Sequence, residues 1–151
     1  MQFNINSADE MEALGGQIGK QLSGSEIIHL QGELGAGKTT LVRGLLYALN
    51  YNGKVKSPTY TLVENYEFDP FTIYHFDLYR LSDPEELEDM GIRDYCINNA
   101  VCLFEWPEQG QGVVPPADVL IRIQYLESGR RLELTGLTDR GCKIIENLNH
   151  F

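Results

Sequence analysis

The sequence predicts an α/β fold, a mixed sheet with a parallel core that is extended by antiparallel strands and flanked by helices. Three observations lead to this prediction. A short apolar run at 25–31 enters a glycine-rich segment, and apolar residues at helical spacing follow at 41–49. The run 100–104 is continuously apolar, which is typical of a buried parallel strand. Apolar and polar residues alternate over 119–124, which indicates a strand with one wet face.

The glycine-rich segment 32–39 reads GELGAGKT and matches the phosphate-binding pattern G-x-x-x-x-G-K-[ST]. Its glycines let the backbone turn tightly, so that several N–H groups point at phosphate oxygens. We expect Lys38 to reach the β- and γ-phosphates, and the hydroxyl of Thr39 to ligate Mg²⁺. The helix that follows aims the positive end of its dipole at the same anion. The sequence therefore predicts a P-loop NTPase-like fold with a nucleotide site formed by Glu33, Leu34, Gly35, Ala36, Gly37, Lys38, Thr39 and Thr40.

The elements before the P-loop follow from local signals. Residues 2–6 are typical of a short edge strand, and 7–10, SADE, form a capping box that opens a helix. Gly24 is expected to close that helix. The helix after the P-loop is expected to end near 50–53. The apolar face of the first helix consists of Met11, Leu14, Ile18 and Leu22.

After the P-loop helix, the polar turn 57–61 enters a segment rich in aromatic and β-branched residues. Two strands joined by the turn Asp69-Pro70 are expected to form a hairpin. The segment 82–85, SDPE, is a second capping box, followed by a short acidic helix that stops near Gly91. Thr138 is expected to cap the last helix. The other predicted ranges are strands at 60–68, 72–79 and 131–137, and a short helix at 92–97.

Length and composition limit the class of protein. A chain of 151 residues predicts a single domain, 1–151, with a real core. The sequence has neither a long apolar run that would span a membrane nor a signal peptide, and its three cysteines lack disulfide or zinc spacing. We therefore expect a cytoplasmic protein without a membrane partner. A net charge of -10 repels a polyanion, so that any RNA is expected to be held by a basic partner.

Two acids are candidates for the chemistry of the site. A P-loop NTPase needs an acid near Mg²⁺ and a group that orients the attacking water. Apolar strand segments end at Asp77 and at Glu105, and ligands of open α/β folds bind at the carboxyl edge of the sheet. The alternative for either residue is an ordinary surface acid. We expect Asp77 to act in hydrolysis and Glu105 to hold Mg²⁺, although the sequence leaves open which acid has which task.

Thr59 and Trp106 are further candidates. Thr59 lies in the polar turn after the P-loop helix, where switch-type loops place a threonine on Mg²⁺ or the γ-phosphate; the alternative is a plain turn residue. Trp106 either stacks on a base or closes the core. His29 and His75 have no metal-ligand spacing, so we expect both to be packed or hydrogen-bonded.

Five blocks, taken together, resemble the TsaE family, formerly called YjeE. They occur in family order between residues 32 and 107, and the stretches outside match less well. The blocks are GELGAGKTT at 32–40, SPTYTLVENY at 57–66, HFDLYRL at 75–81, PEELEDMGIRD at 84–94 and EWP at 105–107.

The resemblance implies a bacterial ATPase that binds ATP/ADP and Mg²⁺ and is needed for the threonylcarbamoyladenosine modification of tRNA. Family members work with TsaB and TsaD, which transfer the threonylcarbamoyl group made by TsaC, and ATP hydrolysis is thought to reset or drive that transferase. This implies contact with tRNA only through the complex. The resemblance also implies roles for single residues: Lys38 and Thr39 at the phosphates and Mg²⁺, Thr59 as a switch-like threonine, Asp77 as the catalytic aspartate, Glu105 on Mg²⁺ directly or through water, and Trp106 at the nucleotide.

Two other functions share the P-loop. A small-molecule kinase would need cationic transfer residues, and the sequence has no arginine-rich lid segment. A nucleotide-gated binding module would bind ATP with only incidental turnover. The guanine-reading pattern N-K-x-D is missing from the sequence, which favours ATP over GTP. We therefore expect Lys38, Thr59 and Asp77 to be the catalytic residues of a slow ATPase.

Overall fold

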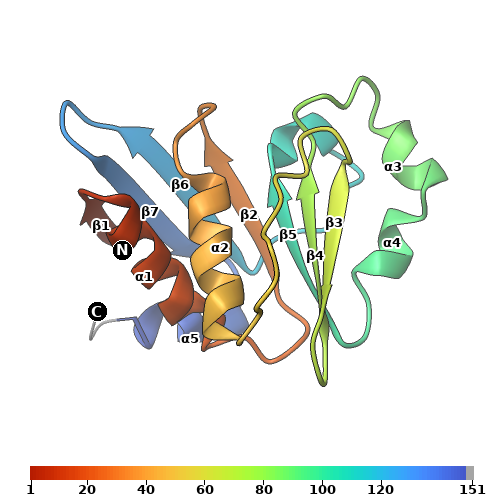
Figure 1. The fold of residues 1–151 in the computed structure, drawn as a ribbon. Helices are drawn as coiled ribbons and strands as arrows, with labels where there is room; N and C mark the ends of the chain where they lie inside the picture. The colour runs from red at the N-terminus through yellow and green to blue at the C-terminus, as the bar shows by residue number, and fades with distance from the viewer. Residues whose placement is uncertain (149–151) are drawn as a thin grey trace.

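The computed structural model of the protein describes residues 1–148 and forms a seven-stranded mixed sheet in the order β1-β7-β6-β2-β5-β4-β3 (Figure 1). Strands β6, β2, β5 and β4 run parallel to one another, whereas β7, β1 and β3 pair antiparallel with their neighbours. This arrangement confirms the predicted parallel core with antiparallel extensions. The strands are β1 (Gln2–Ile5), β2 (Ile27–Gly32), β3 (Val63–Glu67), β4 (Thr72–Asp77), β5 (Ala100–Glu105), β6 (Val119–Tyr125) and β7 (Arg130–Gly136).

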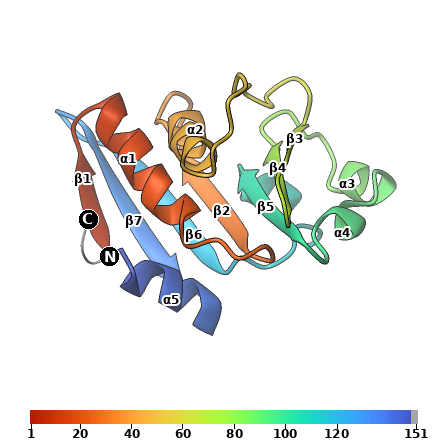
Figure 2. The ribbon, with the colours of Figure 1, turned by 60° about the horizontal axis from the view of Figure 1, so that its bottom comes forward.

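Two groups of helices cover the sheet. Figure 2 shows α1 and α2 over one face and α3 and α4 beside β4 and β5. On β5, Val101 and Leu103 join the core of α1 and α2, whereas Cys102 and Phe104 pack in a second core that contains Leu87 of α3. The run is continuously apolar because both of its faces are buried. The helices are α1 (Ala8–Gly19), α2 (Lys38–Ala48), α3 (Glu85–Asp89), α4 (Ile92–Tyr95), the 3₁₀-helix η1 (Pro107–Gly110) and α5 (Asp139–Glu146).

Helix α1 begins as predicted and ends earlier. The Ser7 hydroxyl accepts from the N–H of Glu10 at 3.1 Å, as a capping box requires. The Glu10 carboxylate reaches back one residue further, to the N–H of Asn6 at 2.8 Å. The predicted end at Gly24 was wrong, because the helix stops at Gly19. The buried carboxylate of Glu26 accepts the N–H groups of residues 23–25 and thereby stabilises a turn in place of further helix.

The hairpin after the P-loop helix is present but shorter than predicted. Strand β3 begins at Val63, because residues 58–62 form a turn closed by the N–H of Leu62 on the Pro58 carbonyl at 2.9 Å. Strand β4 ends at Asp77, whose Oδ1 accepts from the N–H of Tyr79 at 2.9 Å. The side chain of Asp77 thus turns the chain out of the sheet.

Other predicted ends shift by a few residues. The second capping box was wrong, because α3 has no side-chain cap from Ser82, and the Asp83 carboxylate instead accepts from the N–H of Glu85 at 2.9 Å. Helix α4 stops at Tyr95, before the predicted 97. The cap of α5 is confirmed, because Thr138 Oγ1 accepts from the N–H of Gly141 at 3.1 Å. The predicted single domain extends to 151, and 149–151 lie outside the described residues.

Glycines allow α1 to lie directly against α2. A Cβ on Gly15 would stand 2.0 Å from the carbonyl oxygen of Leu41, and a Cβ on Gly44 would stand 2.0 Å from that of Glu12. No side chain fits at such distances, so the two backbones meet only because both positions are glycine. The close crossing fixes the start of α1 beside the P-loop helix. Among the helices of residues 1–148, none has the length and apolar character to cross a membrane.

Candidate nucleotide site

The P-loop joins β2 to α2 in the expected way. Gly35 and Gly37 have φ angles of 76° and 115°, in the left-handed region that favours glycine. Gly37 is the N-cap of α2 and offers no side chain to the first turn of the helix. The N–H groups of that turn are therefore free of a side-chain cap, as in helix N-termini that bind phosphate oxygens.

Lys38 turns back over its own loop. Its Nζ donates to the carbonyl oxygen of Gly32 and, at 3.2 Å, to that of Glu33. Only 5% of the residue is exposed, and burial lowers the pKa of the Lys38 ammonium, while the nearby carboxylates of Glu105 and Asp77 act in the opposite direction. The Lys38 ammonium is thus held by neutral carbonyl groups of its own loop.

The two predicted acids lie side by side. Asp77 and Glu105 are the last residues of β4 and β5 and are register partners in the parallel ladder. Strand β5 also pairs with β2, where Glu105 stands opposite Leu30. Both acids are buried, with exposures of 4% and 3%. The carboxyl edge of the sheet therefore places two carboxylates next to the P-loop.

Each acid has its own hydrogen-bond partners. Asp77 Oδ2 accepts from Thr59 Oγ1 at 3.0 Å, and Ser57 Oγ lies 2.8 Å from the same hydroxyl. Glu105 Oε2 lies 2.5 Å from Nε2 of His75, a residue that sequence reasoning had placed only as packed or hydrogen-bonded. The polar turn thus meets Asp77, and a buried imidazole meets Glu105.

Trp106 lies beside Lys38. Its backbone has a φ of 56°, and its ring centroid lies 4.6 Å from Lys38 Nζ and 5.1 Å from the ring of Tyr79. The indole Nε1 is buried without a hydrogen-bond partner among residues 1–148. The side chain is therefore positioned to contact the lysine, and stacking on a base stays a prediction.

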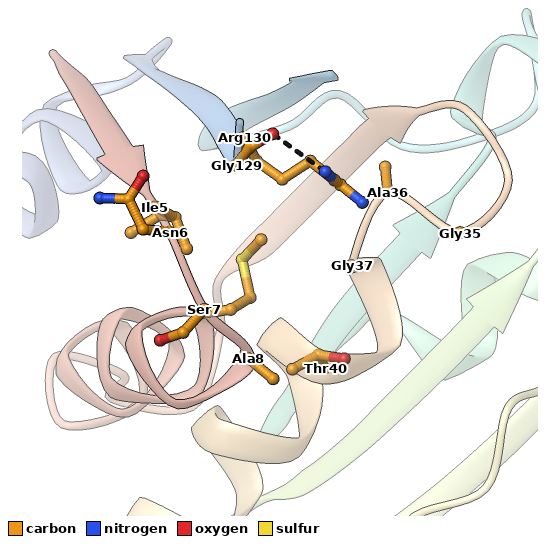
Figure 3. Close-up of a pocket in the computed structure, with 11 residues that line it drawn as sticks. Ile5, Asn6, Ser7, Ala8, Gly35, Ala36, Gly37, Thr40, Gly129 and Arg130 are labelled. Atoms are coloured by element: carbon orange, nitrogen blue, oxygen red, sulfur yellow. Dashed lines mark hydrogen bonds between the residues drawn. The ribbon is translucent and has the colours of Figure 1, made fainter. Parts of the chain in front are cut away.

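A cavity of about 300 Å³ opens on the other side of the P-loop (Figure 3). Its walls come from the junction of β1 and α1, from the P-loop and first turn of α2, and from the turn between β6 and β7. Figure 3 shows Arg130 extending across the cavity towards the P-loop, and its Nη1 donates to the carbonyl oxygen of Gly129 at 2.9 Å. The lining residues are Ile5, Asn6, Ser7, Ala8, Met11, Gly35, Ala36, Gly37, Thr40, Gly129 and Arg130.

Sequence reasoning predicted only the P-loop wall of this cavity, which consists of Gly35, Ala36, Gly37 and Thr40. Ser7 was identified only as a helix cap, and nothing local to Arg130 indicates that it faces the P-loop. Of the predicted nucleotide residues, Thr40 lines the cavity and Thr39 is half-buried. Leu34 is 55% exposed at the tip of the loop, and its carbonyl accepts from the hydroxyl of Tyr125 at 2.6 Å.

Comparison with known proteins assigns the family. The family model of the threonylcarbamoyl adenosine biosynthesis protein TsaE matches residues 5–132. A tRNA threonylcarbamoyladenosine biosynthesis protein TsaE from Haemophilus influenzae is 56% identical over 119 residues, which cover 79% of this chain and 75% of that protein. A protein of the same name from Treponema pallidum is 35% identical over 131 residues, with coverage of 87% and 96%.

A solved structure has the same fold. The crystal structure of Bacillus subtilis YdiB superposes with a TM-score of 0.84 at 24% sequence identity, and the match covers 99% of this chain and 94% of that one. The match to the family model extends over the P-loop, the two acids and all the residues that line the cavity. The resemblance noted in the sequence is thereby confirmed, and the chain belongs to the TsaE family of threonylcarbamoyl adenosine biosynthesis proteins.

Proposed function

We propose that this chain binds Mg·ATP at the P-loop and hydrolyses it slowly, as the ATPase subunit of the machinery that makes threonylcarbamoyladenosine in tRNA. The observation that carries the proposal is the pairing of Asp77 with Glu105 at the carboxyl edge of the sheet, beside Lys38. Phosphoryl transfer needs little more from a protein than positioned charges and a positioned water. Family membership supports the pathway.

The donors present suit a magnesium ion. Two adjacent buried carboxylates repel each other unless a cation or proton lies near them. Mg²⁺ takes oxygen ligands and usually combines one or two protein groups with phosphate oxygens and water. Residues 1–148 contain no cluster of three or more His, Cys, Asp or Glu side chains that would hold a metal alone. In the proposal Thr39 and Glu105 hold the ion together with the nucleotide.

The cavity supports an orientation for the nucleotide. The side chains that line it are mostly small and uncharged, apart from Arg130, and the P-loop forms one of its walls. We place the nucleoside there and the γ-phosphate towards Asp77 and Glu105. Asp77 then orients or deprotonates the attacking water, while Thr59 leaves Asp77 to meet the γ-phosphate or Mg²⁺.

Competition binding is expected to favour ATP over GTP, and a clear preference for GTP would refute this assignment.

The partners in the proposal are TsaB and TsaD. Because the net charge is -10, tRNA is expected to reach this protein only through them. Anisotropy titration of the isolated chain should show weak or no binding of tRNA at physiological salt, and tight, salt-sensitive binding would contradict this expectation.

The deciding experiment is ATP turnover with and without the TsaB–TsaD pair. Turnover is expected to be slow alone and to change when the pair is added. In Lys38→Ala, ATP-dependent activity is expected to be lost while circular dichroism stays native, because the glycines and β2 set the loop without that side chain. Unchanged turnover in this variant would rule out the site, and phosphate transferred to a small acceptor would indicate a kinase.

A further inference from the structure

His75 is fully buried beside the two acids, and the proposed reaction gives it no task. It lies on β4 two residues before Asp77, so both side chains point to the same face of the sheet. That face carries the P-loop helix, because Ile73, the preceding residue of this alternation, packs in the core of α1 and α2. His75 therefore stands directly behind the carboxyl edge of the sheet.

Its contact with Glu105 is close and specific. His75 Nε2 and Glu105 Oε2 are 2.5 Å apart, a direct contact that is closer than the usual N–H···O distance of about 2.7–3.2 Å. For an ionised Glu105 carboxylate, which only accepts, the imidazole tautomer that completes this bond carries its proton on Nε2. No other group in residues 1–148 hydrogen-bonds the side chain of Glu105. One carboxylate oxygen is thus fixed by the imidazole, and Oε1 has no hydrogen-bond partner among residues 1–148.

The other ring nitrogen shows that His75 does more than fill space. His75 Nδ1 is buried without a hydrogen-bond partner among residues 1–148. A buried polar atom without a partner costs free energy that an apolar side chain of similar size would avoid. A histidine here therefore bears the cost of burying Nδ1 in order to place Nε2 against Glu105. The value of the residue lies in the Nε2 contact.

We propose that His75 is a positioning residue for the metal site, which fixes the Glu105 carboxylate so that Oε1 is presented to Mg²⁺ or to its bound water. This inference rests on the proposed Mg·ATP function. His75 itself touches neither metal nor nucleotide. Groups that orient a metal ligand in this way commonly alter metal affinity by about 10–100-fold when they are replaced.

The test compares three replacements of His75 by their effect on Mg²⁺-dependent ADP binding, measured by calorimetry with and without Mg²⁺. The amide nitrogen of His75→Gln reaches the place of Nε2, whereas that of His75→Asn is too short and His75→Leu has no donor. We expect the Gln variant to keep the Mg²⁺ affinity within a few-fold. The Asn and Leu variants are expected to lose about 10–100-fold.

His29→Leu is the matched control, because His29 on the neighbouring strand β2 is half-buried and bonds the carbonyl oxygen of Pro115 at 2.9 Å, away from both acids. It should leave Mg²⁺ affinity unchanged, and ADP affinity in EDTA should be the same in every folded variant. Absence of any nucleotide binding by the natural protein would defeat the proposed function itself. Normal Mg²⁺ affinity in the Asn variant would overturn the role of His75 alone. Equal losses in the Asn and Gln variants would overturn it too, and this comparison remains decisive if the Leu variant does not fold.

Discussion

The two sides of the P-loop differ. On the acid side, buried carboxylates stand at strand ends, and on the cavity side, an open cavity is lined mostly by small side chains. Asp77 and Glu105 are almost inaccessible, and each is fixed by a short hydrogen bond to a neighbour. The cavity is lined by residues such as Ala8 and Gly129, with Arg130 as its charged group. In the proposed function, the acid side would supply the groups for the metal and the attacking water, whereas the cavity side would bind the nucleoside.

The two sides also differ in how they are built. The acid side is formed by two adjacent parallel strands. Asp77 and Glu105 are partners in their ladder, so the backbone hydrogen bonds hold the two acids side by side. The cavity side joins three segments that are far apart in sequence, and α1 contributes one wall only because it packs closely on α2. Substitutions of Asp77 and of the cavity residues should therefore have separable effects on kcat and KM.

The largest expected effect is that of Asp77→Asn, which removes a charge with little change in shape. Turnover should fall by about 10²–10⁴-fold, as expected when a positioned acid–base group is lost, while binding of Mg·ATP stays nearly intact. Steady-state turnover and calorimetry measure the two quantities. The control is Asp89→Asn on the exposed face of α3, which should behave like the natural protein.

Glu105→Gln should act on the metal instead. We expect the concentration of Mg²⁺ that half-saturates activity to rise by at least the roughly 10–100-fold that replacing a residue behind a metal ligand commonly costs, with a parallel loss of Mg·ATP affinity. Titration of turnover and of ADP binding with Mg²⁺ provides the measurement. If Asp77→Asn loses the metal and Glu105→Gln loses only turnover, the roles of the two acids are exchanged.

Gly15→Ala tests the close packing of α1 on α2, which holds the cavity wall beside the P-loop helix. The new methyl group would meet the carbonyl of Leu41, so α1 must move away from α2, at a cost of about 1–3 kcal/mol in the free energy of unfolding. Urea unfolding and KM for ATP should both change. Gly16→Ala is a matched control, because its Cβ would lie 3.5 Å from its nearest neighbours and alanine favours helix. Equal stability of the two variants would contradict the close crossing.

The smallest expected effect belongs to Ala8→Leu, which adds bulk to the cavity wall. If strain of about 1 kcal/mol results, ATP affinity falls by about fivefold, and kcat stays unchanged. Inhibition by inorganic tripolyphosphate, which has no nucleoside, should not change. Ala13→Leu, at an exposed position of the same helix, is the control. A loss that is equal for ATP and tripolyphosphate would mean that the nucleoside does not lie in this cavity.

The acid side could be predicted from sequence because its signals are local. A motif, two apolar runs that end in acids and a hairpin turn were sufficient to place Lys38, Asp77 and Glu105 together. Thr59 lies beside Asp77 because its turn leads into the strand that pairs with β4.

The cavity side could not be predicted in this way. Arg130 follows a turn in an ordinary hairpin, and the approach of Ser7 to the P-loop depends on the crossing of two helices, which no periodicity reports. Element ends were missed where side chains bond the backbone: Glu26 stabilises the turn after α1, and Asp77 turns the chain after β4. Such competition between side-chain and backbone partners is not visible in hydrophobic patterns.

The position of Trp106 gives this site an optical signal. It is the only tryptophan in the chain, so tryptophan fluorescence reports on this one position. Its ring faces the ammonium of Lys38 at 4.6 Å, and a nearby positive charge changes the energy of the excited indole. If phosphates draw Lys38 away from the ring, the emission spectrum should shift as nucleotide binds. Stopped-flow recording of that emission would then follow the arrival and departure of phosphate in real time, without any attached dye.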